Sequence, residues 1–113
     1  ELILAGERIT DDIIVASGDN PKCYNNVVIS KAADTMLAMA GIKATFVVAR
    51  TSDSTVNISA RSHKTINVQR IMEKMGGGGH FNLAACQLRD CSVAQAKNKL
   101  IETIMGELAP KED

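Results

Sequence analysis

The sequence has 113 residues, and its 13 lysines and arginines balance 13 aspartates and glutamates, which gives a formal net charge of zero at pH 7. This length predicts one domain, and the balanced charge excludes a general electrostatic attraction to nucleic acid or membranes. Aromatic residues make up only 3% of the chain and tryptophan is absent, so stacking of nucleobases on aromatic platforms is not expected.

The first half of the sequence predicts a strand, a helix and a second strand. Residues 13–16 form a short apolar run, which polar residues with a proline end at about residue 21. A helix is expected at 27–40, where Gly41 ends it, and a second strand at 44–50. The expected apolar helix face consists of Val28, Ala32, Met36, Met39 and Ala40. This succession indicates a right-handed crossover between two strands.

The second half predicts an antiparallel hairpin followed by two helices. After a polar turn at 51–54, residues 55–60 alternate, with Val56, Ile58 and Ala60 on one face and Asn57, Ser59 and Arg61 on the other. Thr65 or Asn67 can cap a short helix whose apolar stripe is Val68, Ile71, Met72 and Met75. A short strand is expected at 86–89, and Ser92 with Gln95 matches a capping box that begins a last helix.

These elements define the fold class as α/β, with a small mixed sheet of about four to five strands flanked by helices. The single domain covers residues 1–113. We expect all five methionines, Met36, Met39, Met72, Met75 and Met105, in an aliphatic core.

Cysteine usage and hydropathy indicate the cellular compartment of the protein. Cys23, Cys86 and Cys91 form no C-x-x-C pair and leave one cysteine unpaired, which favours a reducing cytosol over a disulfide framework or a zinc site. No apolar run approaches the roughly 20 residues of a transmembrane helix. Because the sequence opens at Glu1 rather than at methionine, we expect it to be part of a longer protein.

The most informative motif is the run Gly76, Gly77, Gly78, Gly79 and His80. Glycines leave main-chain amides accessible, and concave arrays of amides bind anions, phosphate above all. Gly76 also stands where a left-handed residue ends the preceding helix. A flexible linker is the alternative, and the patterned flanks make it the weaker one. The motif therefore predicts a phosphate-bearing ligand.

Arg61 and Ser59 share the polar face of their expected strand, so both can approach that ligand. A guanidinium can hold a phosphate through two parallel hydrogen bonds, and a hydroxyl can add another. His80 can donate to a phosphate oxygen, contact a base or cap the turn that follows it. A lone histidine is more often structural, but the position directly after four glycines favours the ligand role. Asn82 and Gln87 carry amides that could contact a base edge or satisfy the backbone instead.

Catalytic signatures are missing from the sequence. There is no G-x-x-x-x-G-K-[ST] phosphate loop and no G-x-G-x-x-G fingerprint, because Phe81 stands at the last position. Only two histidines occur, and no cluster of aspartates surrounds them to hold a two-metal centre. We therefore expect a chain that binds a phosphate without hydrolysing it, and no catalytic residue is assigned.

The sequence resembles the DHHA1 domain, the C-terminal half of DHH-family phosphoesterases. The resemblance covers nearly all of the chain, and its specific part is the string from Ser59 to Leu88, which contains Ser-Ala-Arg-Ser, the glycines with His80, and Ala84-Ala85. Within the family the sequence is most similar to GdpP-type enzymes, which hydrolyse cyclic di-AMP to pApA. Those enzymes also end a stretch of small residues in Gln-Leu, as Gln87 and Leu88 do here.

The resemblance implies a division of labour between two domains. A preceding DHH domain would hold two manganese ions and activate water, while this domain would contact substrate through Ser59, Arg61, Ser62 and the loop from Gly76 to His80. The DHH motif is absent here, so no metal ligand is assigned and the fragment alone is expected to be inactive. The parent protein would be anchored in the cell membrane, with this domain on the cytoplasmic side and without direct membrane contact.

Partners implied by the resemblance are the DHH domain and a cyclic dinucleotide or short oligonucleotide. A homodimer stays open. Two alternatives remain: the corresponding domain of a nano-RNA or pAp phosphoesterase, and the tRNA-binding module of an alanyl-tRNA synthetase. The latter typically has an arginine where His80 stands, and zero net charge disfavours it.

Overall fold

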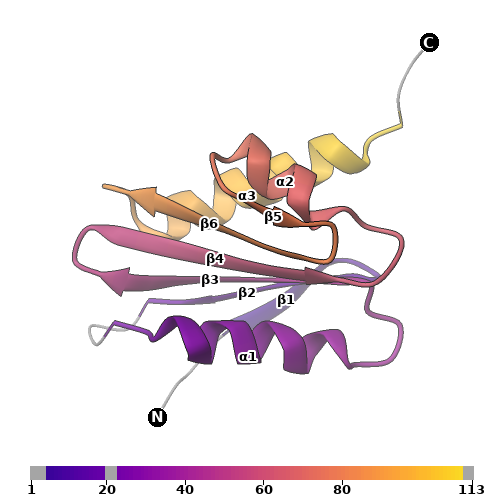
Figure 1. The fold of residues 1–113 in the computed structure, drawn as a ribbon, viewed down its shortest axis with the longest axis horizontal. Helices are drawn as coiled ribbons and strands as arrows, with labels where there is room; N and C mark the ends of the chain where they lie inside the picture. The colour runs from indigo at the N-terminus through magenta and orange to yellow at the C-terminus, as the bar shows by residue number, and fades with distance from the viewer. Residues whose placement is uncertain (1–4, 20–22, 111–113) are drawn as a thin grey trace.

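The computed structural model describes residues 5–19 and 23–110. One six-stranded sheet carries helices on both faces (Figure 1). The elements are β1 (Ala5–Thr10), β2 (Ile13–Gly18), α1 (Asn26–Leu37), β3 (Ala44–Ser52), β4 (Thr55–Ser62), α2 (Val68–Lys74), β5 (Gly78–His80), β6 (Leu83–Arg89) and α3 (Val93–Leu108).

The strand order in the sheet is β1-β2-β3-β4-β6-β5. β2 and β3 pair in parallel across the crossover through α1, and every other neighbouring pair is antiparallel. The predicted α/β class, the crossover and the hairpin of β3 with β4 are thus confirmed. The sheet has six strands where about four to five were expected, because β1 and β5 were not expected as strands. Both lie at sheet edges, where pairing with a single neighbour suffices despite weak strand propensity.

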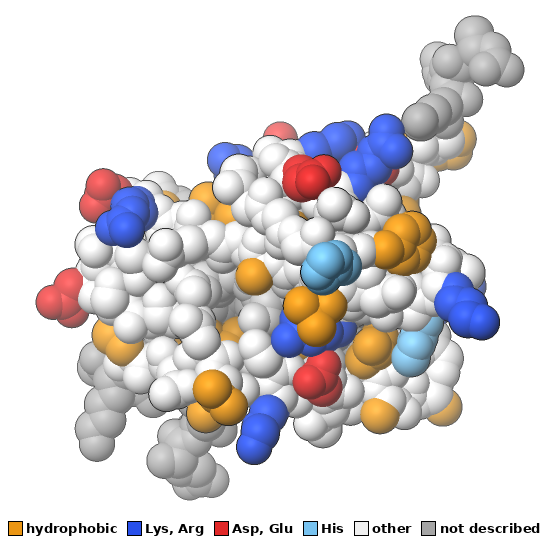
Figure 2. All heavy atoms as spheres, in the orientation of Figure 1, with side chains coloured by type: hydrophobic (Ala, Val, Ile, Leu, Met, Phe, Trp, Pro, Cys, Tyr) orange, Lys and Arg blue, Asp and Glu red, His pale blue; other side chains and the backbone are white. Residues whose placement is uncertain are grey.

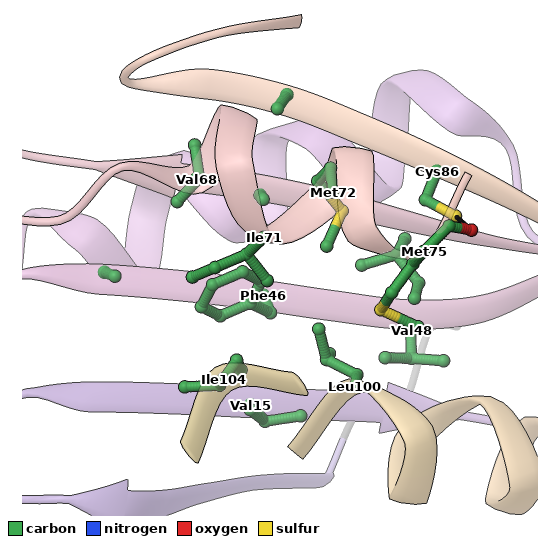
Figure 3. Close-up of a cluster of buried hydrophobic side chains, with 14 of the residues drawn as sticks. Val15, Phe46, Val48, Val68, Ile71, Met72, Met75, Cys86, Leu100 and Ile104 are labelled. Atoms are coloured by element: carbon green, nitrogen blue, oxygen red, sulfur yellow. Dashed lines mark hydrogen bonds between the residues drawn. The ribbon is translucent and has the colours of Figure 1, made fainter. Parts of the chain in front are cut away.

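Two hydrophobic cores lie on the two faces of the sheet, because successive strand residues point to opposite sides. The larger core fills the space between the sheet and helices α2 and α3 (Figure 3). Its members include Val15, Phe46, Val48, Ile71, Met72, Leu100 and Ile104. The smaller core lies beneath α1 and consists of Ala16, Tyr24, Ile29, Ala33, Val47 and Ala49.

The buried face of helix α1 is shifted from the predicted one, because Ala32 and Met36 pack against the smaller core as expected but are only partly buried. Ile29 and Ala33 are fully buried, whereas Val28 and Met39 are 38% and 47% exposed. Asn25 fixes the first turn by accepting a hydrogen bond from the amide of Val27 at 2.7 Å. The helix ends at Leu37, so Met39 lies beyond it. On α3, Met105 is also 46% exposed, and the expectation of a core position is therefore wrong for Met39 and Met105.

The caps of the later helices follow the sequence. Asn67, one of the two candidate caps, accepts a hydrogen bond from the amide of Arg70 at 3.1 Å. Ser92 and Gln95 form the reciprocal capping box at the start of α3. These caps fix where α2 and α3 begin, and hence how both helices cover β6 and β3.

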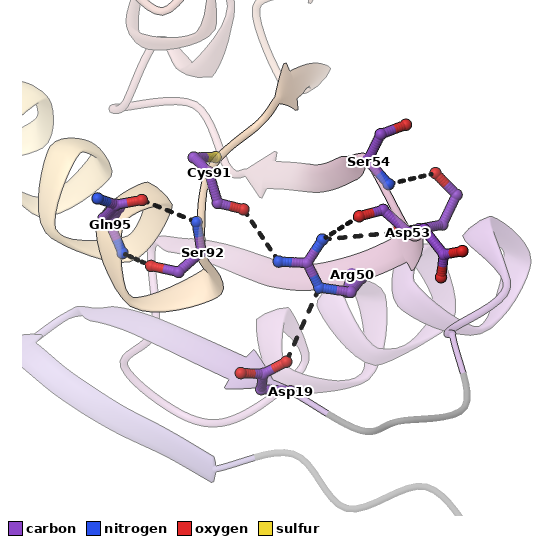
Figure 4. A network of polar contacts seen from close by, with 8 residues as sticks. Asp19, Arg50, Asp53, Ser54, Cys91, Ser92 and Gln95 are labelled. Atoms are coloured by element: carbon purple, nitrogen blue, oxygen red, sulfur yellow. Dashed lines mark hydrogen bonds and ion pairs between the residues drawn. The ribbon is translucent and has the colours of Figure 1, made fainter.

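Arg50 joins three connections at one end of the sheet (Figure 4). Its guanidinium donates to the carbonyl oxygens of Cys91 at 2.9 Å and Asp53 at 3.3 Å. Its Nε lies 3.9 Å from Oδ1 of Asp19. The hairpin turn, the start of α3 and the end of β2 are thereby held together by one side chain.

Candidate functional site

Backbone conformation or close packing requires glycine at three of the four positions of the run. Gly76 has φ +89°, and the amides of Gly76 and Gly77 donate to the carbonyls of Glu73 at 3.1 Å and Met72 at 2.8 Å. This pattern is a Schellman motif that ends α2, as predicted for Gly76. A Cβ on Gly77 would clash with the carbonyl oxygen of Ala85. The amides of Gly76 and Gly77 are therefore committed to the helix end.

The last two glycines belong to a strand, not to an open loop. Gly78–His80 is β5, which pairs antiparallel with β6. Gly79 has φ +146°, and a Cβ there would lie 2.5 Å from the Cα of Ala84. Gly78 differs, because a Cβ there would have nothing within 4 Å. Helix capping and sheet pairing therefore order this backbone, and binding of a phosphate by its remaining amides stays a prediction. A Cβ would have open space at Gly76 and at Gly78, but only Gly76 has a positive φ.

Three polar pairs join one stripe of α1 to the polar face of β4. Nδ2 of Asn57 donates to Oδ1 of Asn26 at 2.8 Å, and the hydroxyls of Ser30 and Ser59 lie 3.4 Å apart. The sequence placed Asn57, Ser59 and Arg61 on one face, and the structure confirms this. The sequence analysis did not identify their partners on the helix, although the spacing i, i+4, i+8 of residues 26, 30 and 34 indicates one helix stripe.

Arg61 and Asp34 form the third of these polar pairs, which together make up the seam between α1 and β4. Nε of Arg61 donates to Oδ1 of Asp34 at 2.9 Å, and Nη1 donates to the carbonyl of Ala60 at 2.9 Å. The side chain of Arg61 is only 11% exposed, against 61% for Asp34. Within the described part of the chain, Nη2 has no hydrogen-bond partner, so one nitrogen of the guanidinium remains able to bind an anion.

Strand register places the candidate residues in three rows on the face that carries α1. Directly paired residues of antiparallel strands point to the same side. The arginine row consists of Arg61, Leu83 and His80; the small row of Ser59, Ala85 and Gly78; and the amide row of Asn57 and Gln87.

Among the described residues, no helix covers the β6 and β5 end of these rows on this face. Leu83 is 51% exposed, and Ala85, Gln87 and His80 are exposed as well. On the other face, Ala84 and Cys86 are buried beneath α2 and α3. In Figure 1, α1 runs along the opposite part of the sheet from β5 and β6. The rows therefore form an open shelf with α1 at one border.

The structure separates Ser62 from the other candidate residues. Its side chain is 5% exposed and its hydroxyl donates to the carbonyl of Ile66 at 2.6 Å. Nδ2 of Asn82 donates to the same hydroxyl at 3.3 Å. Along β4, Ser62 alternates with Arg61 and so points to the opposite face. Ser62 supports the turn before α2 and the turn between β5 and β6, whereas Ser59, Arg61, Gly78 and His80 share the shelf.

Lysine and arginine side chains are interspersed with aspartate and glutamate over the face shown in Figure 2. Within residues 5–19 and 23–110, no three histidine, cysteine, aspartate or glutamate side chains gather as a metal site. No described helix is long and apolar enough to cross a membrane.

Comparisons with known proteins identify the family. The DHHA1 domain model matches residues 11–109. The cyclic-di-AMP phosphodiesterase PdeA of Listeria monocytogenes is 47% identical over 103 residues, which are 91% of this chain and 16% of that protein. The cyclic-di-AMP phosphodiesterase GdpP of Bacillus subtilis is 44% identical over 96 residues, 83% of this chain and 15% of that protein. The chain belongs to the DHHA1 domain family.

Solved structures show the same fold at low sequence identity. The C-Ala domain of alanyl-tRNA synthetase from Aquifex aeolicus has a TM-score of 0.65 at 18% identity, covering 88% of this chain and 96% of that chain. The pGpG-specific phosphodiesterase PggH from Vibrio has a TM-score of 0.59 at 14% identity, covering 89% of this chain and 35% of that chain. The predicted fold class and family are thereby confirmed.

Proposed function

We propose that this chain is the substrate-binding domain of a phosphodiesterase that hydrolyses cyclic di-AMP to pApA. The observation that carries the proposal is its identity of 44–47% with three cyclic-di-AMP phosphodiesterases over 81–91% of its length. The chain spans only 14–16% of those relatives. Hydrolysis is therefore proposed for a longer protein, and binding for this domain.

The shelf supplies the contacts that such a substrate needs. In the arginine row, Nη2 of Arg61 and the ring of His80 can donate to phosphate oxygens. Asp34 fixes the guanidinium in position and offsets part of its charge. Binding would therefore depend more on the placement of the hydrogen-bond donors than on the net positive charge of the site. The glycines contribute shape: Gly77 and Gly79 allow β5 to approach β6, and Gly78 leaves the surface of the shelf free.

Catalysis is proposed to lie outside the described residues. They provide no metal-ligand cluster, so two manganese ions and the attacking water would belong to a preceding DHH domain. A clean preparation of this chain with manganese should leave cyclic di-AMP intact in a chromatographic assay. Turnover would contradict the proposed division of labour.

Gly78 provides the sharpest test of the shelf. Gly78→Leu should abolish binding of pApA and cyclic di-AMP in calorimetry while the urea unfolding midpoint stays close to that of the unmodified chain. Gly106→Leu is the matched control, because a Cβ at Gly106 on α3 also has nothing within 4 Å. Unchanged affinity in Gly78→Leu would overturn the assignment of the shelf.

Arg61 provides an independent test. Arg61→Ala should weaken binding of pApA by about 1.5–3 kcal/mol, the range of a hydrogen bond to a charged group. Arg70→Ala is the control, because Arg70 also pairs through Nε with a carboxylate, that of Glu107 at 3.1 Å, but lies on α2 across the sheet. Equal losses in both variants would argue for a nonspecific charge effect.

One observation favours a second substrate class. The bifunctional oligoribonuclease and PAP phosphatase NrnA of Thermus thermophilus is 34% identical over 59 residues, or 52% of this chain. A short oligoribonucleotide would place the same phosphate and base groups on the shelf. Binding of pAp or a dinucleotide in preference to cyclic di-AMP would favour this class. For the C-Ala domain only the fold is similar, and the zero net charge of this chain does not favour tRNA binding.

A further inference from the structure

Of the two side-chain amides on the shelf, that of Asn57 is hydrogen-bonded and that of Gln87 has no partner among the described residues. Asn57 is held on both sides, because its Oδ1 accepts from Thr51 at 3.0 Å and its Nδ2 donates to Asn26. Nδ2 of Asn82 donates to the carbonyl of His63 at 2.7 Å. Gln87 is exposed, and its amide makes no hydrogen bond to any residue that the structure describes. Its donor and acceptor therefore both remain available.

The register separates Gln87 from the arginine row by a defined distance. Leu83, Ala85 and Gln87 point to the same face of β6. Strand residues rise about 3.4 Å each, so the arginine row and the amide row lie about 14 Å apart, with the small row between them. The long side chain of Gln87 can reach inward from one end, while Asp34 and the carbonyl of Ala60 hold the guanidinium of Arg61 at the other. The remaining gap suits a nucleotide with its phosphate at one end and its base at the other.

The small row provides room for the middle of such a ligand. Ala85 and Gly78 present a methyl group and a hydrogen, and Ser59 is a buried residue, 7% exposed. The border formed by α1 adds an apolar surface. Val27 lies on the same helix stripe as Ser30 and Asp34, at i, i+3 and i+7, and is 61% exposed.

We infer that Gln87 determines base specificity, selecting adenine in a nucleotide that lies along β6 with its phosphate at Arg61 and His80. The inference rests on the proposed function and adds the orientation of the ligand and the residue that reads its base. A carboxamide presents one donor and one acceptor side by side, which match the N7 acceptor and the N6 amino donor of adenine. Guanine presents two acceptors, N7 and O6, at the corresponding edge, so the same amide makes one hydrogen bond instead of two.

The test measures the contributions of the base and of the phosphate to binding separately. Affinities of the ¹⁵N-labelled chain for AMP, GMP and ribose 5-phosphate are measured by NMR titration, for the unmodified chain and for Gln87→Met, which keeps the length of the side chain. We expect about tenfold tighter binding of AMP than of GMP, as one bidentate contact provides. Gln87→Met should lose this preference and leave the affinity for ribose 5-phosphate unchanged. The side-chain NH₂ resonances of Gln87 should shift with AMP and not with ribose 5-phosphate.

Gln87→Glu reverses the hydrogen bonding and serves as the second variant. A carboxylate accepts only, so it pairs with the N1 and N2 donors of guanine and repels N7 of adenine. The AMP-to-GMP affinity ratio should therefore invert. Asn98→Glu on α3 is the charge control, because Asn98 is exposed and lies outside the shelf.

The outcomes distinguish the two proposals. If AMP and ribose 5-phosphate both bind, and both Gln87 variants keep the AMP-to-GMP ratio of the unmodified chain, the role of Gln87 is overturned while the shelf stands. If neither AMP nor ribose 5-phosphate nor pApA binds, the proposed function fails first and the inference fails with it. Selective loss of base discrimination, with retained ribose 5-phosphate binding, supports both.

Discussion

Asp34 on α1 and Arg61 on β4 are joined by a hydrogen-bonded ion pair of 2.9 Å across the border between helix and sheet. The two residues differ in environment, because the arginine side chain is 11% exposed and the carboxylate 61%. A guanidinium that is largely withdrawn from water needs partners, and Asp34 and the carbonyl of Ala60 supply them. The pair therefore orients the only cation in the arginine row that is always charged.

The ion pair predicts a coupling between the two residues. Asp34→Asn should lower the free energy of unfolding by about 1 kcal/mol, since one partner is exposed and the other is not. A double-mutant cycle with Arg61→Met, measured by urea unfolding, should give a coupling energy of similar size. Asp11→Asn, at an exposed carboxylate outside the seam, should change stability little. A coupling energy near zero would show that Arg61 is held in place without Asp34.

The same substitution at two adjacent glycines should change stability to different extents. In Gly77→Ala the new methyl group would meet the carbonyl of Ala85 and, at 2.8 Å, the Cα of Cys86. Backbone atoms cannot yield, so stability should fall by about 2–3 kcal/mol or the chain should fail to fold. Gly78→Ala has open space and should be nearly neutral, as thermal unfolding would show. A comparable loss in both variants would mean that β5 does not pack as described.

Sequence patterns predicted the elements whose signals are local. The alternation of residues 55–60, the capping box at Ser92 and the position of Gly76 at the end of α2 depend on neighbours within a few residues, and each is confirmed. The strand at Gly78–His80 was not predicted, because glycine has weak strand propensity and only β6 holds it there. The buried face of α1 was predicted only in part: Ala32 and Met36 pack against the smaller core, but its centre is formed by Ile29 and Ala33, which pack with Ala16 and Val47.

The geometry of the candidate site could be predicted only in part, for the same reason. Ser59 and Arg61 share a strand, so their common face follows from the period of two. Their association with His80 and Gly78 depends on the register of three strands, which no local signal reveals. The resemblance to the family grouped Ser62 with them, although one step along a strand reverses the direction of a side chain.

Ser62 and Ser59 should therefore differ when each is changed to alanine. Ser62→Ala removes a buried donor to Ile66 and leaves that carbonyl with one partner fewer, so the unfolding free energy should fall by about 1–2 kcal/mol. Its affinity for pApA should stay unchanged. Ser59→Ala should weaken pApA binding more than it lowers stability, because its 3.4 Å contact with Ser30 is long. Calorimetry and urea unfolding on both variants would decide. The reverse pattern would place Ser62 in the binding site.

Cys86 connects the sheet to the end of α2 from within the larger core. Its side chain is 4% exposed and its Sγ donates to the carbonyl of Met75 at 3.2 Å (Figure 3). Burial raises the pKa of this thiol above its ordinary value of 9.0, the positive charge of Lys99 opposes the rise, and Cys91 adds to it. A thiolate here would lose water and the hydrogen bond to Met75 together. The thiol is therefore neutral in the folded chain.

The raised pKa predicts that stability falls in alkaline solution. Below the ordinary value of 9.0 both the folded and the unfolded chain keep this proton, so Cys86 contributes no pH dependence there. Above it the unfolded chain releases the proton while the folded chain retains it, and the free energy of unfolding declines by at most about 1.4 kcal/mol per pH unit until the folded thiol ionises. Urea unfolding of the reduced chain between pH 8 and 10.5 should show this decline. Cys86→Ala should lose that part of the slope, whereas Cys23→Ala, at an exposed thiol, should keep it. Identical slopes in the two variants would mean that Cys86 reaches water in the folded state.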